Sequence, residues 1–578
     1  MDWLKTRLEI CGTKHSLCQT RAMTKLPKRT ITFQKSQKGE IDVKLVENNS
    51  QQGRYIALSH CWGSSQHCVL KSETLPEYKR SISWNKLPKT FQNSIMFSTE
   101  LNVYHIWIDA LCIIQDDPTD WEIESAKMAD IYQNSYLTLA ATASSNDMGG
   151  FYAEANVTAV AEYELTAPQS LIHSQYIMVR KKLQHWTWPP SKLSKNLFPL
   201  LSRGWAFQER ILSPRVLHFC MDELLWECKE ESVCECGSLP ELPETKKQVY
   251  VPRIESVSQS KERYFRRKTW RRAFERIKVT VLHRARDFTK GQEAPRIDRM
   301  GKAPDRLDAV ENWHRIVEQY SSMKLTTQTD RLPALSGLAV RSSPVLGIYL
   351  AGLWNNSLVS DLMWRVNRLD VGIERATEYI GPSWSWASVT GPVSYWTEAE
   401  NKVMQYDDDL IQCSSFSGKV RVSGANPYGG IRSGTLYIEG FLQPARLQWV
   451  YTRTGGGQQG LSARRELVPL KYGLKIFFPS RYRTEIIAGV PSTVGIPAIE
   501  LPFFADYMLC EEGPQQILDN ASLYLVLIHP SVCLVLKSLD VKSTTFRRIG
   551  IVKQPWALVF EYGFNWMLGS KLSTIQII

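Results

Sequence analysis

The sequence lacks the features that would place a protein across a membrane. Among its 578 residues there is no run of about 18 apolar residues, the length that a membrane-spanning helix needs. The opening stretch, MDWLKTRLEICGTKH, has no apolar core of the kind found in a secretory signal. Without such a signal, the 12 cysteines are expected to be reduced thiols. We therefore expect a cytoplasmic protein with no transmembrane segment.

Motifs typical of several function classes are also missing. The sequence has no tandem repeats and no nucleotide-dependent oligomerisation motif. The glycine-rich stretch GGGQQG at 455–460 has no strand–turn–helix context, so it is not predicted to hold a phosphate. Because no nucleic-acid-binding signature occurs, no nucleic acid is expected as a partner.

The positive charge is concentrated in one segment. The chain carries a net charge of +12, and residues 261–302 alone contain 15 Lys and Arg against 5 Asp and Glu. Trp270, Phe274, Ile277 and Val281 recur there at helical spacing. The pattern favours a helix that packs this stripe on the body. The alternatives are a helix on a membrane surface or a patch for nucleic acid.

The length predicts two or three domains. We divide the chain into an N-terminal lead (1–50), an α/β domain (51–235) with an irregular insertion near 152–195, a basic helical segment and linker (236–305), a helical middle (306–381) and a β-rich C-terminal region (382–578). Strands of the last region are predicted at 435–442, 522–528, 532–536 and 556–561. The aromatic SWSWAS stretch at 383–388 is expected to fill the seam between the last two regions.

Short apolar runs alternate with helical patterns in the α/β domain. Strands are predicted at 55–59, 104–108 and 136–141, and the spacing of apolar residues after Trp121 predicts a helix before the third strand. This alternation is typical of a parallel sheet with covering helices. Ligands bind beyond the carboxyl ends of such strands, so Asp109, which follows the second strand, lies where a site is expected.

Two groups of metal-ligating residues are present, and neither is predicted to bind a metal. Cys11, His15 and Cys18 could offer three ligands, but no fourth is evident nearby and structural zinc needs four. The second group comprises His218, Cys220, Cys228, Cys234 and Cys236. Its spacing fits no common zinc template, so buried or ordinary thiols are favoured for both groups.

Three segments resemble the signature blocks of the fungal heterokaryon incompatibility (HET) domain. They are YIALSHCWG (55–63), IWIDALCIIQDD (106–117) with the following MADIY (128–132), and RGWAFQERILSPRVLHF (203–219). TDRLPALSGLA, YLAGLW and PSWSWASV further along are similar to the body of large HET proteins. The resemblance therefore runs from Trp3 to about Val389, although residues 152–195 offer nothing to align.

The resemblance implies a role in self/non-self recognition between fungal strains, in which HET proteins trigger cell death after incompatible fusion. HET domains have been proposed to be distant relatives of TIR domains, whose active members cleave NAD at the nicotinamide N-glycosidic bond. The resemblance thus implies a TIR-like or flavodoxin-like sheet, with NAD as a possible substrate and no cofactor. Active TIR domains place a Glu four residues after a Trp, the spacing of Glu209 and Trp205 here.

On this basis Glu209 is the candidate catalytic carboxylate. The candidate substrate-binding residues are Ser59, Trp62, Gly63, Asp109 and Trp205. Loss of a cationic nicotinamide needs no general acid, only a carboxylate near the developing ribose cation and a wall that excludes water.

Alternatives remain for several of these residues. Glu209 would instead pair with Arg203, Arg210 or Arg215 on a solvated helix, with Trp205 in the core. Adjacent His60 and Cys61 would point to opposite faces of a strand, which disfavours a thiol nucleophile. The alternative function is a non-enzymatic adaptor that acts by self-association or by binding a protein partner.

Overall fold

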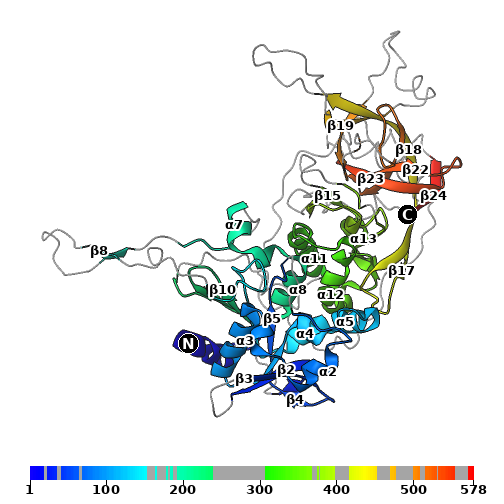
Figure 1. Cartoon of the computed structure of the whole chain (residues 1–578). Coiled ribbons are helices and arrows are strands. Elements are labelled where there is room, and N and C mark those ends of the chain that lie inside the picture. The colour runs from blue at the N-terminus through cyan, green and yellow to red at the C-terminus, as the bar shows by residue number, and fades with distance from the viewer. Residues whose placement is uncertain are drawn as a thin grey trace, which may run out of the picture.

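The computed structural model describes a three-part molecule with an α/β region, a helical middle and a β-rich end (Figure 1). The described residues are 1–18, 23–35, 41–63, 68–152, 163–165, 177–179, 183–186, 192–237, 306–366, 374–376, 378–396, 415–451, 469–476, 499–507, 509, 514–529, 532–553 and 571–578. The basic segment 261–302, the loop 455–460 and the strand predicted at 556–561 lie outside the described residues.

The α/β region is built on an eight-stranded sheet in the order β12-β11-β10-β7-β5-β6-β2-β3. Its strands are β2 (Arg29–Lys35), β3 (Ile41–Glu47), β5 (Ile56–Ser59), β6 (His105–Trp107), β7 (Leu137–Ala140), β10 (Arg215–Phe219), β11 (Leu224–Cys228) and β12 (Ser232–Cys234). A small pair, β1 (Thr24–Lys25) and β4 (Gln52–Gly53), lies beside it. The three strands predicted for this region are confirmed as β5, β6 and β7.

The sheet is mixed, which corrects the expectation of a purely parallel one. Only the four central strands, β10, β7, β5 and β6, run parallel. Antiparallel strands extend both edges, and β2 and β3 come from the N-terminal lead. Taken in chain order, the parallel strands have the spatial order 2-1-3-4, as flavodoxin-like sheets begin. The switch point, where ligands bind in such sheets, therefore lies at the carboxyl end of β5.

Helices cover this sheet and fill the connections between its strands. They are α1 (Asp2–Lys14), α2 (Leu75–Arg80), α3 (Lys89–Glu100), α4 (Asp109–Cys112), α5 (Pro118–Asn134), α7 (Lys192–Leu197) and α8 (Gly204–Leu212). The start of α5 follows from its sequence, because the Asp117 side chain accepts from the amides of Thr119 and Asp120 while Pro118 occupies the first turn. Of the predicted insertion, the described part holds the hairpin β8 (Tyr163–Leu165) and β9 (Ile177–Val179).

The helical middle packs directly on the α/β region. Its elements are α11 (Arg306–Ser321), α12 (Ser336–Leu346), α13 (Leu358–Asp361) and the strand pairs β13 (Tyr349–Leu350) with β14 (Leu353–Trp354) and β15 (Trp364–Val366) with β16 (Val393–Tyr395). Helix α8 contributes Phe207, Ile211 and Leu212 to the same hydrophobic core as α11 and α12. The main chain comes so close at Gly337 that an added Cβ would lie 2.3 Å from the Cβ of Ala129 on α5.

The C-terminal region is β-rich, as predicted. Its strands are β17 (Ser415–Val422), β18 (Ile431–Tyr451), β19 (Pro469–Ile476), β20 (Ile499–Ala505), β21 (Ser522–His529), β22 (Val532–Ser538), β23 (Thr545–Lys553) and β24 (Lys571–Ile577). They form one sheet in which the long β18 pairs with four others. Trp384 and Trp386 are fully buried in a core shared with the helical middle, so they fill the predicted seam.

No helix within the described residues is long and apolar enough to cross a membrane.

A buried ion pair joins the N-terminal lead to α5. The Asp120 carboxylate contacts the guanidinium of Arg29 and lies 2.8 Å from the Lys28 ammonium. It also accepts a 3.0 Å hydrogen bond from the Ile114 amide. Burial alone would raise the pKa of Asp120, but these hydrogen bonds from Lys28, Ile114 and Arg29 hold it below its ordinary value.

The Asp120→Asn variant should lose about 2 to 3 kcal/mol of stability at pH 7, because one charged acceptor of this network is removed. A carboxyl with a depressed pKa stabilises the fold fully above its unfolded-state pKa and loses that effect as the pH falls through the folded-state pKa. The difference from the wild type should therefore shrink below about pH 4. Urea unfolding of both proteins at several pH values measures this difference in stability. A difference that does not change with pH would contradict an ionic role for Asp120.

Candidate active site

Glu209 lies on α8 against the carboxyl end of β5. Its side chain is buried, with the residue 6% exposed, and it lies near the side chains of Ser59 and Tyr132. Tyr132, from α5, donates a 2.9 Å hydrogen bond to the main-chain oxygen of Leu58. Three elements thus converge on one carboxyl group at the switch point of the sheet.

Asp109 brings a second carboxylate to the same place from the end of β6. One of its oxygens accepts a 2.8 Å hydrogen bond from the indole nitrogen of Trp62. The other accepts from the Ala110 amide and lies 3.7 Å from Nδ1 of His60. The Asp109 side chain is 19% exposed, so this cluster reaches solvent through Asp109 and the half-buried Trp62.

Gly63 lets the chain turn away from this cluster. Its φ of +79° falls in the left-handed region, and a Cβ there would lie 2.6 Å from the Cβ of Asn146. The left-handed conformation and the close approach of Asn146 therefore account for glycine at this position.

Burial and like charge set the protonation of the cluster. Burial first, and then the neighbouring Asp109 carboxylate, raise the pKa of Glu209 to about 7 against the opposing effects of Ser59, Arg203 and Tyr132. Burial lowers the pKa of His60 to about 4, so its imidazole is neutral at pH 7. Burial also raises the pKa of Tyr132 well above its ordinary value. At neutral pH Glu209 is thus poised between its two protonation states.

His60 presents a polar atom to the cluster. Its Nδ1 is buried and has no hydrogen-bond partner among the described residues. A neutral imidazole beside Asp109 offers one more donor or acceptor to a polar ligand. Cys61 next to it is buried, which raises the pKa of its thiol, so the thiolate needed for a nucleophile is disfavoured.

The surface ion pairs considered for Glu209 are not what the structure shows. Arg210 binds Glu227 instead, with nitrogen–oxygen distances of 2.7 and 3.0 Å. Arg215 donates to Cys11 and to main-chain oxygens. Arg203 does lie near Glu209, since its positive charge lowers the pKa of that carboxyl, and it donates a 2.7 Å hydrogen bond to the main-chain oxygen of His60.

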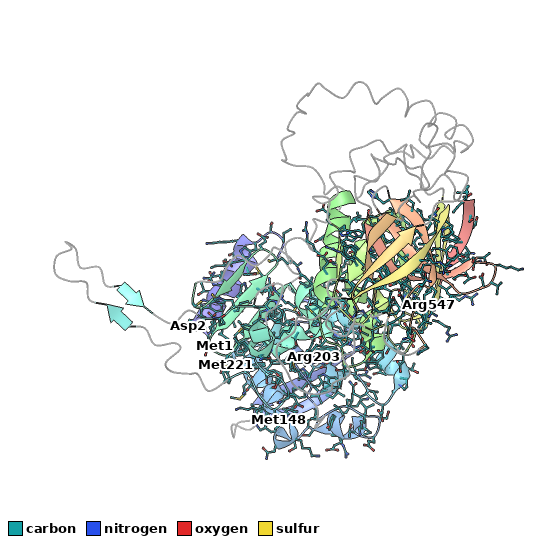
Figure 2. The ribbon with its side chains drawn as sticks, turned by 90° about the horizontal axis from the view of Figure 1, so that it is seen from above. Met1, Asp2, Met148, Arg203, Met221 and Arg547 are labelled. Atoms are coloured by element: carbon teal, nitrogen blue, oxygen red, sulfur yellow. The ribbon has the colours of Figure 1, made fainter. Side chains whose placement is uncertain are left out.

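Trp205 binds the helical middle. Its indole nitrogen donates a 2.9 Å hydrogen bond to the Asp330 carboxylate of the helical middle. On the same helix, the Gln208 side chain accepts a 2.9 Å hydrogen bond from the Gly337 amide. Helix α8, which follows Arg203 (labelled in Figure 2), therefore carries both Glu209 and residues that bind the helical middle.

The sequence did not point to Tyr132 as a member of the cluster, and it offered Arg203 only as an alternative partner of Glu209 and His60 only as a neighbour of Cys61. The signal was present, since each residue lies within one of the three blocks: His60 in YIALSHCWG, Tyr132 at the end of MADIY and Arg203 at the start of RGWAFQE. Their convergence depends on the sheet order, which the blocks do not reveal.

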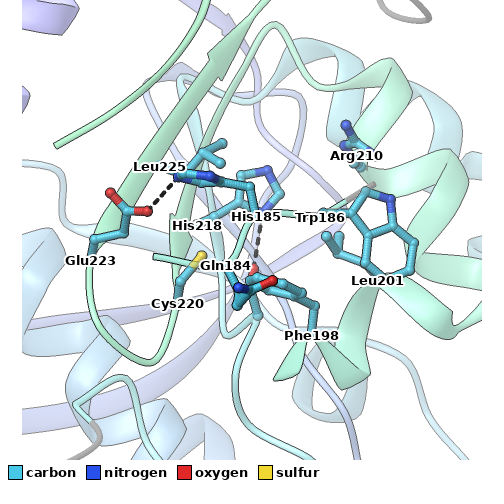
Figure 3. A pocket seen from close by; sticks show the side chains of 11 residues that line it. Gln184, His185, Trp186, Phe198, Leu201, Arg210, His218, Cys220, Glu223 and Leu225 are labelled. Carbon is cyan, nitrogen blue, oxygen red and sulfur yellow. Dashed lines mark hydrogen bonds and ion pairs between the residues drawn. The ribbon is translucent and has the colours of Figure 1, made fainter. Parts of the chain in front are cut away.

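A separate pocket is lined by residues of α8, β10 and β11, and Figure 3 shows His185 there bound to Glu223. Their nitrogen–oxygen distance is 2.8 Å. His218 bridges Thr142 and Glu227 at 2.9 and 3.2 Å beside them. The pocket has room for about one water molecule, a cavity of about 20 Å³, so these residues form a packed polar network and not a substrate site.

Within the part of the chain that the structure describes, two groups of side chains could hold a metal ion. The first comprises Cys11, His15, Cys18 and Cys228, and the second His185, Glu223, Cys234 and Cys236. In each group the ligand atoms lie within 4.8 Å of one another. Neither group includes a member of the Glu209 cluster.

Comparison with known families identifies the region that carries this cluster. Residues 55–209 match the family described as Heterokaryon incompatibility protein (HET). The chain carries a HET domain. The matched range begins at the strand leading to Ser59 and ends at Glu209. Both ends of the range therefore contribute residues to the Glu209 cluster. No curated protein and no solved structure matches the chain significantly.

Proposed function

We propose that this HET protein acts in heterokaryon incompatibility as an effector that cleaves NAD at the nicotinamide N-glycosidic bond and so causes cell death. The observation that carries this proposal is the buried Glu209 carboxyl beside Asp109 at the carboxyl end of β5. Paired carboxyl groups with one raised pKa are typical of enzymes that handle sugar cations.

The residues can be assigned roles in that reaction. Water adds to C1′ of the nicotinamide ribose while the C1′–N bond breaks, and the bond's electron pair neutralises the pyridinium ring. The products are neutral nicotinamide, ADP-ribose and one proton, so the leaving group needs no acid. Ionised Glu209 would stabilise the ribose cation, and Asp109 would bind ribose hydroxyls or orient the water. Trp62, fixed by its hydrogen bond to Asp109, would cover the site against bulk water.

The test is nicotinamide release from NAD by the purified full-length protein at high concentration. The whole chain is needed, because a fragment ending after β12 would expose Phe207, Ile211 and Leu212 and break the bond from Trp205 to Asp330. Because the ionised form of Glu209 is required, kcat/KM should rise with pH and level off above about pH 7. Below that pH the rate should fall about tenfold per pH unit. A folded full-length protein that releases no nicotinamide would refute the proposal.

The adaptor function is the second candidate, and the burial of Glu209 favours it. A carboxyl that is only 6% exposed and lies near Ser59 and Tyr132 would serve equally to hold α8 against β5 and α5. An adaptor would signal by self-association or by binding a protein partner, and its association would not depend on NAD. Sedimentation of the full-length protein with and without NAD, alongside the turnover assay, separates the adaptor from the enzyme. An adaptor would associate equally in both conditions and release no nicotinamide.

A further inference from the structure

The structure brings Cys228, from the end of β11, next to three ligand-type residues at the N-terminus. Cys11 lies on α1, and His15 and Cys18 follow in the turn after it. We propose that Cys11, His15, Cys18 and Cys228 form a structural zinc site that fastens α1 to the edge of the HET-domain sheet. The site is independent of the Glu209 cluster and of the NAD-cleaving function.

The geometry of the four side chains suits tetrahedral zinc. Their ligand atoms all lie within 4.8 Å of one another, and Sγ of Cys228 is 3.4 Å from Nδ1 of His15. Zinc–sulfur bonds of about 2.3 Å place the ligand atoms of a tetrahedron about 3.8 Å apart, so only small movements are needed to close the site. Three thiolates and one imidazole are a standard set for structural zinc, which leaves no open position for chemistry.

The surroundings supply what such ligands require. Nε2 of His15 faces the Glu231 carboxylate at 4.0 Å, the arrangement that orients a zinc-binding imidazole from its far side. The Glu231 amide donates to Sγ of Cys228 at 3.3 Å. Zinc with three thiolates carries one net negative charge, and the Arg215 guanidinium donates to Sγ of Cys11 at 3.2 Å to balance it.

Burial and chain geometry explain what the metal would do. Cys11, Cys18 and Cys228 are almost fully buried, so they are shielded from oxidants and competing ligands. Helix α1 has 13 residues, of which only Leu4 and Cys11 are buried. Trp3 and Leu8 are partly buried and pack against the same core. The helix packs on β11, and Met1 at its start lines a pocket together with Met221 (both labelled in Figure 2). A zinc ion would add a covalent link between α1 and β11 to these packing contacts.

The direct test is the metal content of the full-length protein, purified without chelator and measured by mass spectrometry. The His15→Ala variant should contain one zinc per chain less than the wild type, and so should Cys228→Ser. The matched control is Cys68→Ser, which changes a buried thiol that contacts Tyr78 and lies outside the cluster. It should keep the wild-type zinc content. Reconstitution with Co²⁺ should give thiolate-to-cobalt absorption that is lost in His15→Ala.

Two results would overturn the proposal. One is a folded wild-type protein that contains no zinc and gives no cobalt–thiolate absorption. The other is a disulfide between two of the three cysteines, found by mass mapping of the alkylated protein. Because the wild-type metal content is measured first, failure of a variant to fold does not leave the question open. Turnover of NAD is not used as a readout, so this test stands apart from that of the catalytic function.

Discussion

The Glu209→Gln variant should release nicotinamide from NAD about 10² to 10³ times more slowly than the wild type. Its amide keeps hydrogen-bonding capacity toward Ser59 and Tyr132 but cannot carry the negative charge that stabilises the ribose cation. Near neutral pH about half of the wild-type Glu209 is protonated, and glutamine resembles that form. The variant should therefore fold normally, and the loss should appear in kcat.

The matched control for this experiment is Glu124→Gln. Glu124 is also a buried glutamate of the α/β region, but its carboxylate binds Lys127, 2.8 Å away on the same helix. Its variant should keep wild-type turnover. The raised pKa of Glu209 adds a second readout, because its ionisation costs folding energy as the pH rises from about 4.5 to about 7. Relative to the wild type, Glu209→Gln should gain thermal stability across that range. Equal turnover in Glu209→Gln and the wild type would exclude Glu209 from catalysis.

The Arg548→Ala variant should lose about 3 to 5 kcal/mol of stability, because it leaves a fully buried carboxylate without its partner. Arg548 and Asp506 are both 0% exposed and are joined by two hydrogen bonds of 3.1 and 3.2 Å. The guanidinium also donates to the main-chain oxygens of Leu362 and Trp364 at 2.8 and 2.6 Å, and lies 3.6 Å from the Trp364 ring centre. It therefore connects β23 to β15 and to β20 at once.

Denaturant unfolding of the full-length protein measures this loss. The neighbouring Arg547→Ala variant is the control, since Arg547 is only half-buried and lines an open pocket (labelled in Figure 2). It should change stability by less than about 0.5 kcal/mol. In Arg548→Ala, replacing Asp506 by Asn as well should restore part of the loss, because the unpaired charge is then gone. Additive losses in the double variant would show that the pair is not coupled.

Local sequence determined the elements that surround the candidate site. Runs of β-branched and aromatic residues without Gly or Pro marked β5, β6 and β7 to within a residue or two. Such runs form strands wherever they are buried on both faces, as the central strands of a parallel sheet are. The place of Asp109 beyond β6 followed from the same rule.

Other features depended on contacts between residues far apart in the chain. The antiparallel edge formed by β2 and β3 was missed because these strands lie in the lead, which has no local feature that ties it to the parallel core. The spacing of Trp205 and Glu209 does not reveal whether Trp205 faces a substrate or the core. In the structure the indole nitrogen of Trp205 binds Asp330, which is 125 residues away in the chain. The periodicity of α8 predicts a helix but not which neighbour each of its faces will meet.

The sequence by itself therefore determined the central strands, the helix with Glu209 and the HET resemblance, because propensity and periodicity act over a few residues. Only the tertiary structure decided that Glu209 is buried beside Asp109 and not paired at the surface. Only it supplied Cys228 as the fourth partner of Cys11, His15 and Cys18, across 210 residues of chain from Cys18. Burial and metal geometry are properties of packing, and packing brings together residues whose separation along the chain carries no signal.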